Sequence, residues 1–303
     1  MKTQEIRKKR KRFTSDTALE IFVTLILIAI LLIVGYPVIY VISASFSNNE
    51  ALTAGKVILW PVNFTTASYR FVFHFKQVWV GYRNTVFYTV VGVLFTLIME
   101  TLMAYPLSKK KYQGRKFMTT LMIIAMMTTA GLIPTYIIMK MLGLVDTVWA
   151  VLLTGILPFR NVIILRTAFR SSVPDEMYEA AKIDGAGDFQ TLVRVGLPLV
   201  KPVVSVLTLY AIVAKWNEYF TSMIYLHDQN MYPLQLVLRS ILTASQTIDA
   251  SAVSGSEMMA ILQGGTEGIR YALIIVSTVP LLAAYAIVQK YFKGGIMIGA
   301  VKG

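Results

Sequence analysis

The sequence predicts an all-α, polytopic membrane protein with six transmembrane helices. The chain of 303 residues is 56% hydrophobic and 15% charged, whereas a soluble domain has about 45–50% apolar and about 25% charged residues. The apolar residues gather in six charge-poor stretches, each near the roughly 20 residues that a helix needs to cross a bilayer. The net charge of +13 comes mainly from residues beside these stretches, which argues against a nucleic-acid-binding protein.

The first stretch, residues 21–42, has no charged residue and follows a basic run at 8–12. A signal peptide begins in a similar way, but its apolar core is usually only about 7–15 residues long. We therefore expect a retained transmembrane helix.

Five further spans are expected, and three of them carry charged side chains well away from their ends. Glu100 lies in the second, Arg160 in the fourth, and Lys215 and Glu218 in the fifth. Charges inside a span are costly and by default mark a transport path or an ion pair. Pro134 lies near the far end of the third span, and Pro158 interrupts the fourth. The five spans cover residues 84–107, 117–139, 147–165, 199–225 and 269–288.

The distribution of basic residues predicts the orientation, because Lys and Arg are retained in short cytoplasmic loops. Six spans place both termini on one side. With the N-terminus inside, the inside segments hold 20 Lys and Arg residues and the outside segments hold 7. We therefore expect a basic cytoplasmic N-terminus at 1–20, a transmembrane domain at 21–288, and a cytoplasmic tail at 289–303.

Two outside segments are long. Residues 43–83 are rich in aromatic side chains, which favours short helices at the membrane interface. Residues 226–268 are rich in Ser, Thr, Gln and Gly. They predict either an external cap with a docking surface or a solvated connection.

The inside segment 171–198 predicts two short helices joined by a turn, a shape suited to docking. Ser171 and Ser172 are expected to cap the first helix, with Pro174 in its first turn. Gly185 is expected to take a positive φ in the turn, where a side chain is disfavoured. The second helix is expected over about 188–195, and the prolines at 198 and 202 then begin the fifth span.

The same segment carries a family resemblance. Glu179-Ala180-Ala181, then Asp184-Gly185-Ala186, then Leu197-Pro198 resembles the EAA loop of ABC-importer permease subunits. More specifically, the chain resembles the carbohydrate-uptake permeases of maltose and multiple-sugar type, as the second permease of the heterodimer. Four other segments also resemble the family and occur in the family's order along the chain. They are residues 35–37 with 43–47, 133–134 with 143–147, 216–220, and 291–303.

The resemblance implies that this chain forms a sugar pathway with a second permease and works by alternating access. It also implies two ATP-binding subunits, an extracytoplasmic sugar-binding protein and a bacterial cytoplasmic membrane. The chain has no phosphate-binding loop of the G-x-x-x-x-G-K-[ST] type, so ATP and Mg are expected on the partner subunits, and the chain itself is expected to be neither an enzyme nor a cofactor-binding protein. The implied coupling residues are Glu179, Ala180, Ala181, Asp184, Gly185 and Ala186.

The polar residues of the fifth span are candidates for the substrate path. Carboxylate and amide groups hydrogen-bond sugar hydroxyls, and aromatic rings cover the apolar face of a sugar. The competing interpretation is an ion pair between Lys215 and Glu218, which lie three residues apart on a helix. Arg160 is expected to pair with a carboxylate that the sequence does not identify. The candidate path residues are Trp216, Asn217, Glu218, Tyr219 and Glu100.

Three other functions are alternatives. Within the importer hypothesis, a permease for polyols or glycerol phosphate is the closest competitor of a carbohydrate permease. A secondary transporter or channel is less favoured because no internal repeat is present, and a structural anchor does not explain the loop 171–198. The histidines, His74 and His227, lie in unrelated outside segments, so no metal site is expected.

Overall fold

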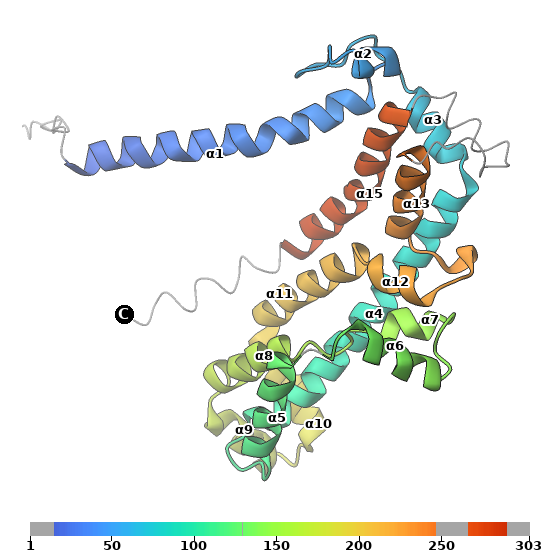
Figure 1. Cartoon of the computed structure of the whole chain (residues 1–303). Helices are drawn as coiled ribbons and strands as arrows, with labels where there is room; N and C mark the ends of the chain where they lie inside the picture. Colours follow the sequence, from blue (N-terminus) through green and yellow to red (C-terminus); the bar gives the residue numbers. More distant parts are fainter. Residues whose placement is uncertain (1–14, 129, 247–265, 290–303) are drawn as a thin grey trace, which may run out of the picture. The chain divides into compact units, whose positions relative to one another are not determined.

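The computed structural model describes residues 15–128, 130–246 and 266–289, and every regular element in these ranges is helical. The chain divides into two compact units. The first contains residues 1–70 and 256–275, and the second contains 71–255 and 276–303. The order of the helices along the chain can be followed in Figure 1.

The first unit is built around the end of a long apolar helix. Helix α1 (Ser15–Ser45) contains the expected first span, and most of its large apolar side chains are exposed, as expected of a surface that faces lipid. Its last turns pack with the short helix α2 (Asn49–Thr53). The core here consists of Ala44, Ala51, Leu52 and Val57.

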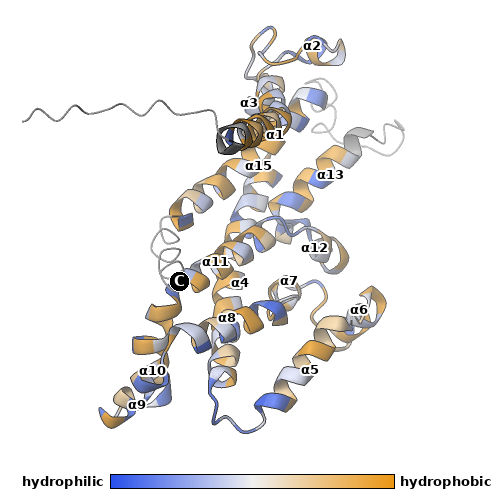
Figure 2. Cartoon of the chain, turned by 90° about the vertical axis from the view of Figure 1, so that its left-hand side faces the viewer, coloured by the Kyte–Doolittle hydropathy of each residue, from blue (hydrophilic) through white to orange (hydrophobic). Residues whose placement is uncertain are grey.

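The second unit is centred on helix α4 (Lys76–Ser108), which packs against α8 (Phe159–Ser172) and α11 (Leu197–Trp216). Their main core includes Ala104, Val162, Leu165, Phe169 and Leu207. Figure 2 shows apolar residues along these long helices, while the chain near α9 carries more polar residues. The remaining helices of this unit are α5 (Arg115–Met127), α6 (Leu132–Met141), α7 (Val148–Leu153), α9 (Asp175–Ile183), α10 (Asp188–Thr191), α12 (Phe220–Tyr225) and α13 (Leu234–Gln246).

Helix α3 (Ala67–His74) lies at the boundary of the two units, and α15 (Thr266–Gln289) belongs to both. Together with α2, α3 shows that segment 43–83 does contain short helices. The segment that is expected outside after the fifth span begins with a 3-10 turn (Gln229–Met231) and then α13. The rest of that segment, residues 247–265, and the tail from 290 lie outside the described residues.

Within the described ranges, four helices are long and apolar enough to cross a membrane. They are Leu19–Ser45, Lys76–Ser108, Asp188–Trp216 and Glu267–Gln289. A fifth candidate is the pair α5 and α6, which passes the same test together but bends by 116°. The prediction of a multi-pass helical membrane protein therefore holds, and three of the six expected spans differ in detail.

The third expected span is two helices, because the chain changes direction before α6. Gly131 has a φ of +75° and begins α6. Pro134 then lies in the first turn of α6, where backbone N–H groups have no intrahelical acceptor and the missing N–H of proline costs nothing. The apolar stretch 117–139 is therefore divided between α5 and α6.

The fourth expected span, 147–165, is not one helix either. Helix α7 ends at Leu153, Gly155 has a φ of +68°, and Pro158 precedes α8. Because α8 continues to Ser172, it contains both serines that were expected to cap the next helix. Ser171 donates within α8 to the carbonyl of Ala168 at 3.3 Å, so the capping prediction is wrong.

The fifth expected span begins earlier and ends sooner than predicted. The helix runs from Asp188 through a π-helical turn (Leu192–Gly196) into α11, and it stops at Trp216. The wider π turn leaves room for the ring of Pro198, which would crowd an ordinary α-helical carbonyl. Pro198 and Pro202 therefore lie inside a continuous helix, and α12 is a separate element after the break at 217–219.

Candidate functional site

The loop between α9 and α10 contains the predicted glycine turn and the predicted short helix before it, whereas the predicted short second helix is the start of the long helix that continues into α11. Gly185 has a φ of +76°, which an L side chain rarely adopts. The turn closes through hydrogen bonds from Gly185 N to Lys182 O at 3.1 Å and from Ala186 N to Ala181 O at 2.9 Å. The chain thus reverses direction immediately after α9.

The six predicted coupling residues lie together on this loop. Glu179, Ala180, Asp184 and Gly185 are exposed, Ala186 is half-buried and Ala181 is buried. Two large apolar side chains beside them are also exposed, Ile183 at 86% and Phe189 at 72%. The loop therefore presents small, acidic and apolar groups on one accessible segment, which suits close approach by another protein surface.

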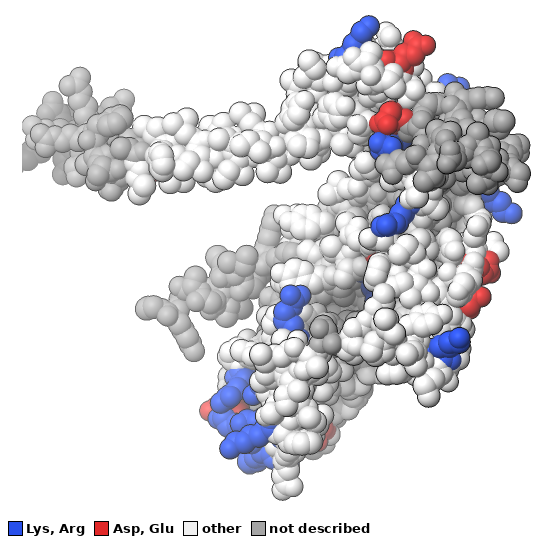
Figure 3. All heavy atoms as spheres, in the orientation of Figure 1, with Lys and Arg blue, Asp and Glu red and all other residues white. Residues whose placement is uncertain are grey.

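Basic side chains gather on the visible face of the second unit near α9 (Figure 3). At the start of α9, Lys110 donates to Asp175 at 2.7 Å. This hydrogen bond and the positive charge lower the pKa of the Asp175 carboxyl. Both side chains are largely exposed, so the pair orients the start of α9 more than it stabilises the fold.

Aromatic contacts attach α9 to the end of α4. The rings of Tyr105 and Tyr178 lie edge to face with centroids 6.1 Å apart, and Lys109 Nζ lies 2.8 Å from the Tyr178 ring centroid. Burial lowers the pKa of Lys109 to about 8, and the acids Asp188 and Asp175 oppose that shift. Burial also raises the pKa of Tyr178 to about 12.

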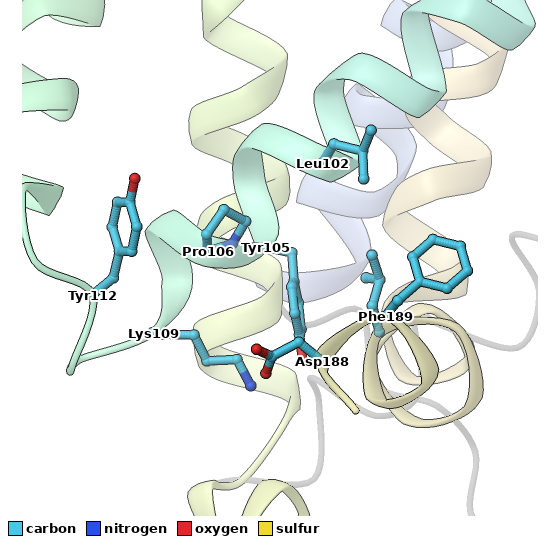
Figure 4. A pocket seen from close by; sticks show the side chains of 8 residues that line it. Leu102, Tyr105, Pro106, Lys109, Tyr112, Asp188 and Phe189 are labelled. Atoms are coloured by element: carbon cyan, nitrogen blue, oxygen red, sulfur yellow. The ribbon is translucent and has the colours of Figure 1, made fainter. Parts of the chain in front are cut away.

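A cavity of about 350 Å³ opens beside these contacts. Figure 4 shows Lys109 and Asp188 pointing toward one another at its edge, with Phe189 on α10 beyond them. The cavity thus lies between the end of α4 and the second helix of the loop. Its lining residues are Leu102, Tyr105, Pro106, Lys109, Tyr112, Asp188, Phe189 and Leu192.

Four of the five predicted path residues, those at 216–219, lie at the break between α11 and α12, and Glu100 does not. Asn217 is exposed and accepts from Gln235 at 3.4 Å, and the Arg239 guanidinium lies 4.8 Å from the centroid of the Tyr219 ring. Gln235 and Arg239 both come from α13. The break therefore brings an amide, an aromatic ring and a cation together on two elements.

Trp216, in contrast, is 7% exposed and donates its indole N–H to the carbonyl of Ser277 at 3.0 Å. Tyr82 donates to the neighbouring carbonyl of Val276. Pro280 lacks the N–H that would bond Val276 O in an unbroken helix, and its ring crowds that turn. Tyr82 thus supplies the donor that Val276 lacks because of the proline, and Trp216 donates to the next carbonyl along α15.

The two charges of the fifth span bond to helix ends rather than to each other. Lys215 Nζ donates to the carbonyls of Val151 at 3.0 Å and Thr154 at 3.1 Å, at the C-terminal end of α7. Glu218 accepts from Thr221 N at 2.6 Å and from Ser222 Oγ at 2.8 Å, at the start of α12. No ion pair within 4.0 Å joins Lys215 to Glu218. The competing prediction of such a pair is therefore wrong at contact distance, because each charge has a nearer partner of the complementary helix-end polarity.

Glu100 is fully buried on α4, and its Oε1 accepts from the amide of Asn161 on α8 at 2.8 Å. Arg160, the residue before Asn161, is exposed, and no carboxylate of the described residues lies within ion-pair distance of it. The expected pairing of Arg160 with a carboxylate therefore does not occur among the described residues. The buried acid of the second span instead bonds to an uncharged neighbour.

Sequence reasoning missed Asn161, Gln235 and Arg239. Asn161 is an uncharged polar residue inside an apolar stretch, and this feature alone could have marked it as a candidate in the sequence. Gln235 and Arg239 lie four residues apart, on one face of a helix, but only the fold brings that face to residues 217–219. Groups of three or more His, Cys, Asp or Glu side chains with metal-site geometry do not occur in the described part of the chain.

Comparisons with known proteins give a consistent result. Residues 78–297 match the family described as binding-protein-dependent transport system inner membrane component. Protein LplC of Bacillus subtilis is 38% identical over 88% of this chain and 89% of its own length. The polygalacturonan/rhamnogalacturonan transport system permease protein YtcP, also of Bacillus subtilis, is 35% identical over 90% of this chain and 94% of its own.

A solved structure is similar over nearly the whole chain. It is a crystal structure of a bacterial ABC transporter involved in the import of the acidic polysaccharide alginate. The matching chain is 34% identical, with a TM-score of 0.82, and the alignment covers 93% of this chain and 100% of that one.

Proposed function

Because the chain belongs to the family of binding-protein-dependent transport system inner membrane components, we propose that it is one membrane-spanning subunit of an ATP-driven importer of acidic oligosaccharides. The observation that carries the proposal is the likeness over nearly the whole chain to subunits of carbohydrate importers. Two of those relatives are named for acidic polysaccharides, alginate and polygalacturonan. Substrates of this kind carry one carboxylate on each uronic acid unit.

The six-span topology is part of this proposal. Helices α1, α4 and α15 each cross the membrane once, and α10, the π turn and α11 form one further crossing. The bent pair α5 and α6 and the broken pair α7 and α8 supply the remaining two. Broken helices are tolerated inside a membrane where protein groups bond the freed backbone, and Lys215 bonds the carbonyls at the end of α7.

The partners supply what an ATP-driven importer needs besides this subunit. A second permease completes the pathway, and an extracytoplasmic binding protein delivers the sugar. Two ATP-binding subunits hold ATP and Mg and dock on the loop that joins α9 to α10. The exposed Ile183 and Phe189 support this docking, since apolar side chains of that size favour a protein partner over water.

The substrate class is supported by the groups at the break between α11 and α12. Asn217 and Tyr219 offer an amide and a ring for sugar, and Arg239 offers a cation for a uronate carboxylate. Glu218 already accepts two hydrogen bonds at the start of α12, so its charge is partly satisfied before substrate arrives. The path proposal therefore rests most on Asn217 and Tyr219.

The substrate proposal predicts selective uptake. Cells with the assembled importer should take up galacturonic-acid oligosaccharides and not neutral galactose oligosaccharides of equal length. Replacing Arg239 by Gln should reduce uptake of the acidic oligosaccharide by about tenfold, the effect of losing one charge-assisted hydrogen bond. The control, Lys140→Gln, removes an exposed positive charge on α6 and should have no effect. Equal uptake of both sugars with unchanged uptake in Arg239→Gln would refute an acidic substrate.

The topology is tested by cysteine labelling, because the chain has no cysteine. Two exposed residues serve as probes, Gln229 in the segment expected outside and Gln113 in the segment expected inside. In intact cells, a membrane-impermeant thiol reagent should label Gln229→Cys and leave Gln113→Cys unlabelled. After the cells are opened, both positions should react. Labelling of Gln113→Cys alone in intact cells would reverse the orientation.

A further inference from the structure

A buried polar pair joins α4 to α8 and is only half satisfied. The side chains of Glu100 and Asn161 are 0% and 4% exposed. Asn161 Nδ2 donates to Glu100 Oε1 at 2.8 Å, whereas Glu100 Oε2 and Asn161 Oδ1 are buried without any hydrogen-bond partner. Buried polar atoms are normally bonded, so these two oxygens require an explanation.

A charged carboxylate does not provide one. Carboxylate and amide oxygens both accept hydrogen bonds and do not donate, so neither oxygen satisfies the other. An isolated buried charge is also expensive unless a cation or several donors compensate it.

The basic side chains on the helices around Glu100 bond elsewhere. Arg166 on α8 donates to the carbonyl of Leu107 at 3.2 Å, and Lys215 on α11 donates to the end of α7. Arg160 on α8 and Lys201 on α11 are exposed. No ion pair within 4.0 Å reaches Glu100 from any described residue, so the carboxyl group has one amide donor and no cation.

We propose that Glu100 carries a proton on Oε2 and forms a reciprocal, uncharged pair with Asn161. The Oε2–H group donates to Asn161 Oδ1, while Asn161 Nδ2–H donates to Glu100 Oε1. One added proton thus supplies the single donor that both orphaned oxygens lack, and it removes the buried charge. The acid and the amide then bond face to face through two parallel hydrogen bonds.

The pair makes Glu100 a positioning residue for the coupling loop, and this consequence rests on the proposed function. Helix α8 ends at Ser172 and α9 begins at Asp175, so the position of α8 determines where the loop begins. Asn161 lies in the first turn of α8 and fixes that end of the helix to α4. Glu100 therefore acts between helices rather than on substrate.

The side-chain lengths allow an isosteric exchange as the test. Glu100→Gln keeps a neutral, reciprocal pair, because an amide offers one donor and one acceptor in the same places. Asn161→Asp places two carboxyl groups together in a buried site. The double variant Glu100→Gln with Asn161→Asp restores one acid and one amide, with the acid now on α8.

We expect the complete importer to be unaffected by Glu100→Gln, in both yield and thermal unfolding. Asn161→Asp should lower the yield by about tenfold, because a buried carboxylate then lacks its partner, and the double variant should recover most of the loss. Glu100→Leu should also lower the yield, because it leaves Asn161 without a hydrogen-bond partner. A normal yield in this variant would mean that the pair is dispensable. Infrared spectra should contain a protonated-carboxyl carbonyl band that is missing in Glu100→Gln.

Three results would overturn the proposal. The first is the absence of a protonated-carboxyl band that Glu100→Gln removes, which would show that Glu100 carries no proton. The second is a loss of yield in Glu100→Gln as large as that in Glu100→Leu, which would show that the charge itself is required. The third is a normal yield with a changed uptake affinity in Glu100→Gln, which would place Glu100 on the substrate path. Yield, unfolding and the infrared band do not depend on which sugar is transported, so they remain decisive if the proposed substrate is wrong.

Discussion

Replacing Lys215 by methionine is expected to remove most of the assembled importer from the membrane. The ammonium group donates to Val151 O and Thr154 O, and methionine has no donor for them. An unbonded buried carbonyl costs about 1–3 kcal/mol, and these two lie where Gly155 ends the helix. The loss should appear as a lower yield of detergent-extracted complex and a lower unfolding temperature.

The double variant separates helix capping from an ion pair. Under an ion pair, Lys215→Met combined with Glu218→Gln would recover the yield, because no unpaired charge would remain. Since each charge bonds to a different helix end, we expect the double variant to be no better than Lys215→Met. Glu218→Gln alone should cost about 1 kcal/mol, the typical value of one helix cap. Full recovery in the double variant would contradict the capping assignment.

Replacing Gly185 by valine is expected to abolish uptake while ATP hydrolysis continues. Its φ of +76° disfavours an L residue by about 1–2 kcal/mol, and β-branching makes that conformation harder still. Open space surrounds the glycine, so the effect comes from the backbone and not from a clash. The measurements are uptake and ATP hydrolysis by the same reconstituted complex.

The matched control is two residues away. Gly187 also lies in open space but has an ordinary φ of −70°, so Gly187→Val should transport normally. Glu179→Lys, which reverses the charge of the exposed face of α9, should resemble Gly185→Val. Equal, normal uptake in both glycine variants would show that the turn does not couple hydrolysis to transport.

Much of this architecture can be predicted from local sequence. Residues 21–42 and 269–288 are uniformly apolar, so their helices follow from composition alone. The turn at Gly185 is likewise predictable, because the glycine directly follows a short run of helix-favouring residues. The helices of the first and sixth expected spans, and α9 with the turn after it, therefore agree closely with the sequence prediction, whereas the expected short helix at 188–195 is the start of a longer one.

The breaks were harder to predict because hydropathy averages over them. The stretch 147–165 remains apolar on average across Gly155, although the backbone there leaves the helix. What makes such a break tolerable lies far away in sequence: Lys215 is 64 residues from Val151. The Glu100–Asn161 bond spans 61 residues, and no local pattern marks either partner for the other.

The proline in α15 has a mechanical consequence. The carbonyls of Val276 and Ser277 bond to Tyr82 of α4 and Trp216 of α11, and Pro280 offers Val276 no backbone N–H in exchange. If α11 slid or rotated away from α15, the indole N–H of Trp216 and the carbonyl of Ser277 would lose a buried hydrogen bond, and leaving a buried polar group unbonded costs about 1–3 kcal/mol. The part of α15 from Val276 onward is therefore expected to move together with α4 and α11, so that a displacement of one helix is transmitted to the other two.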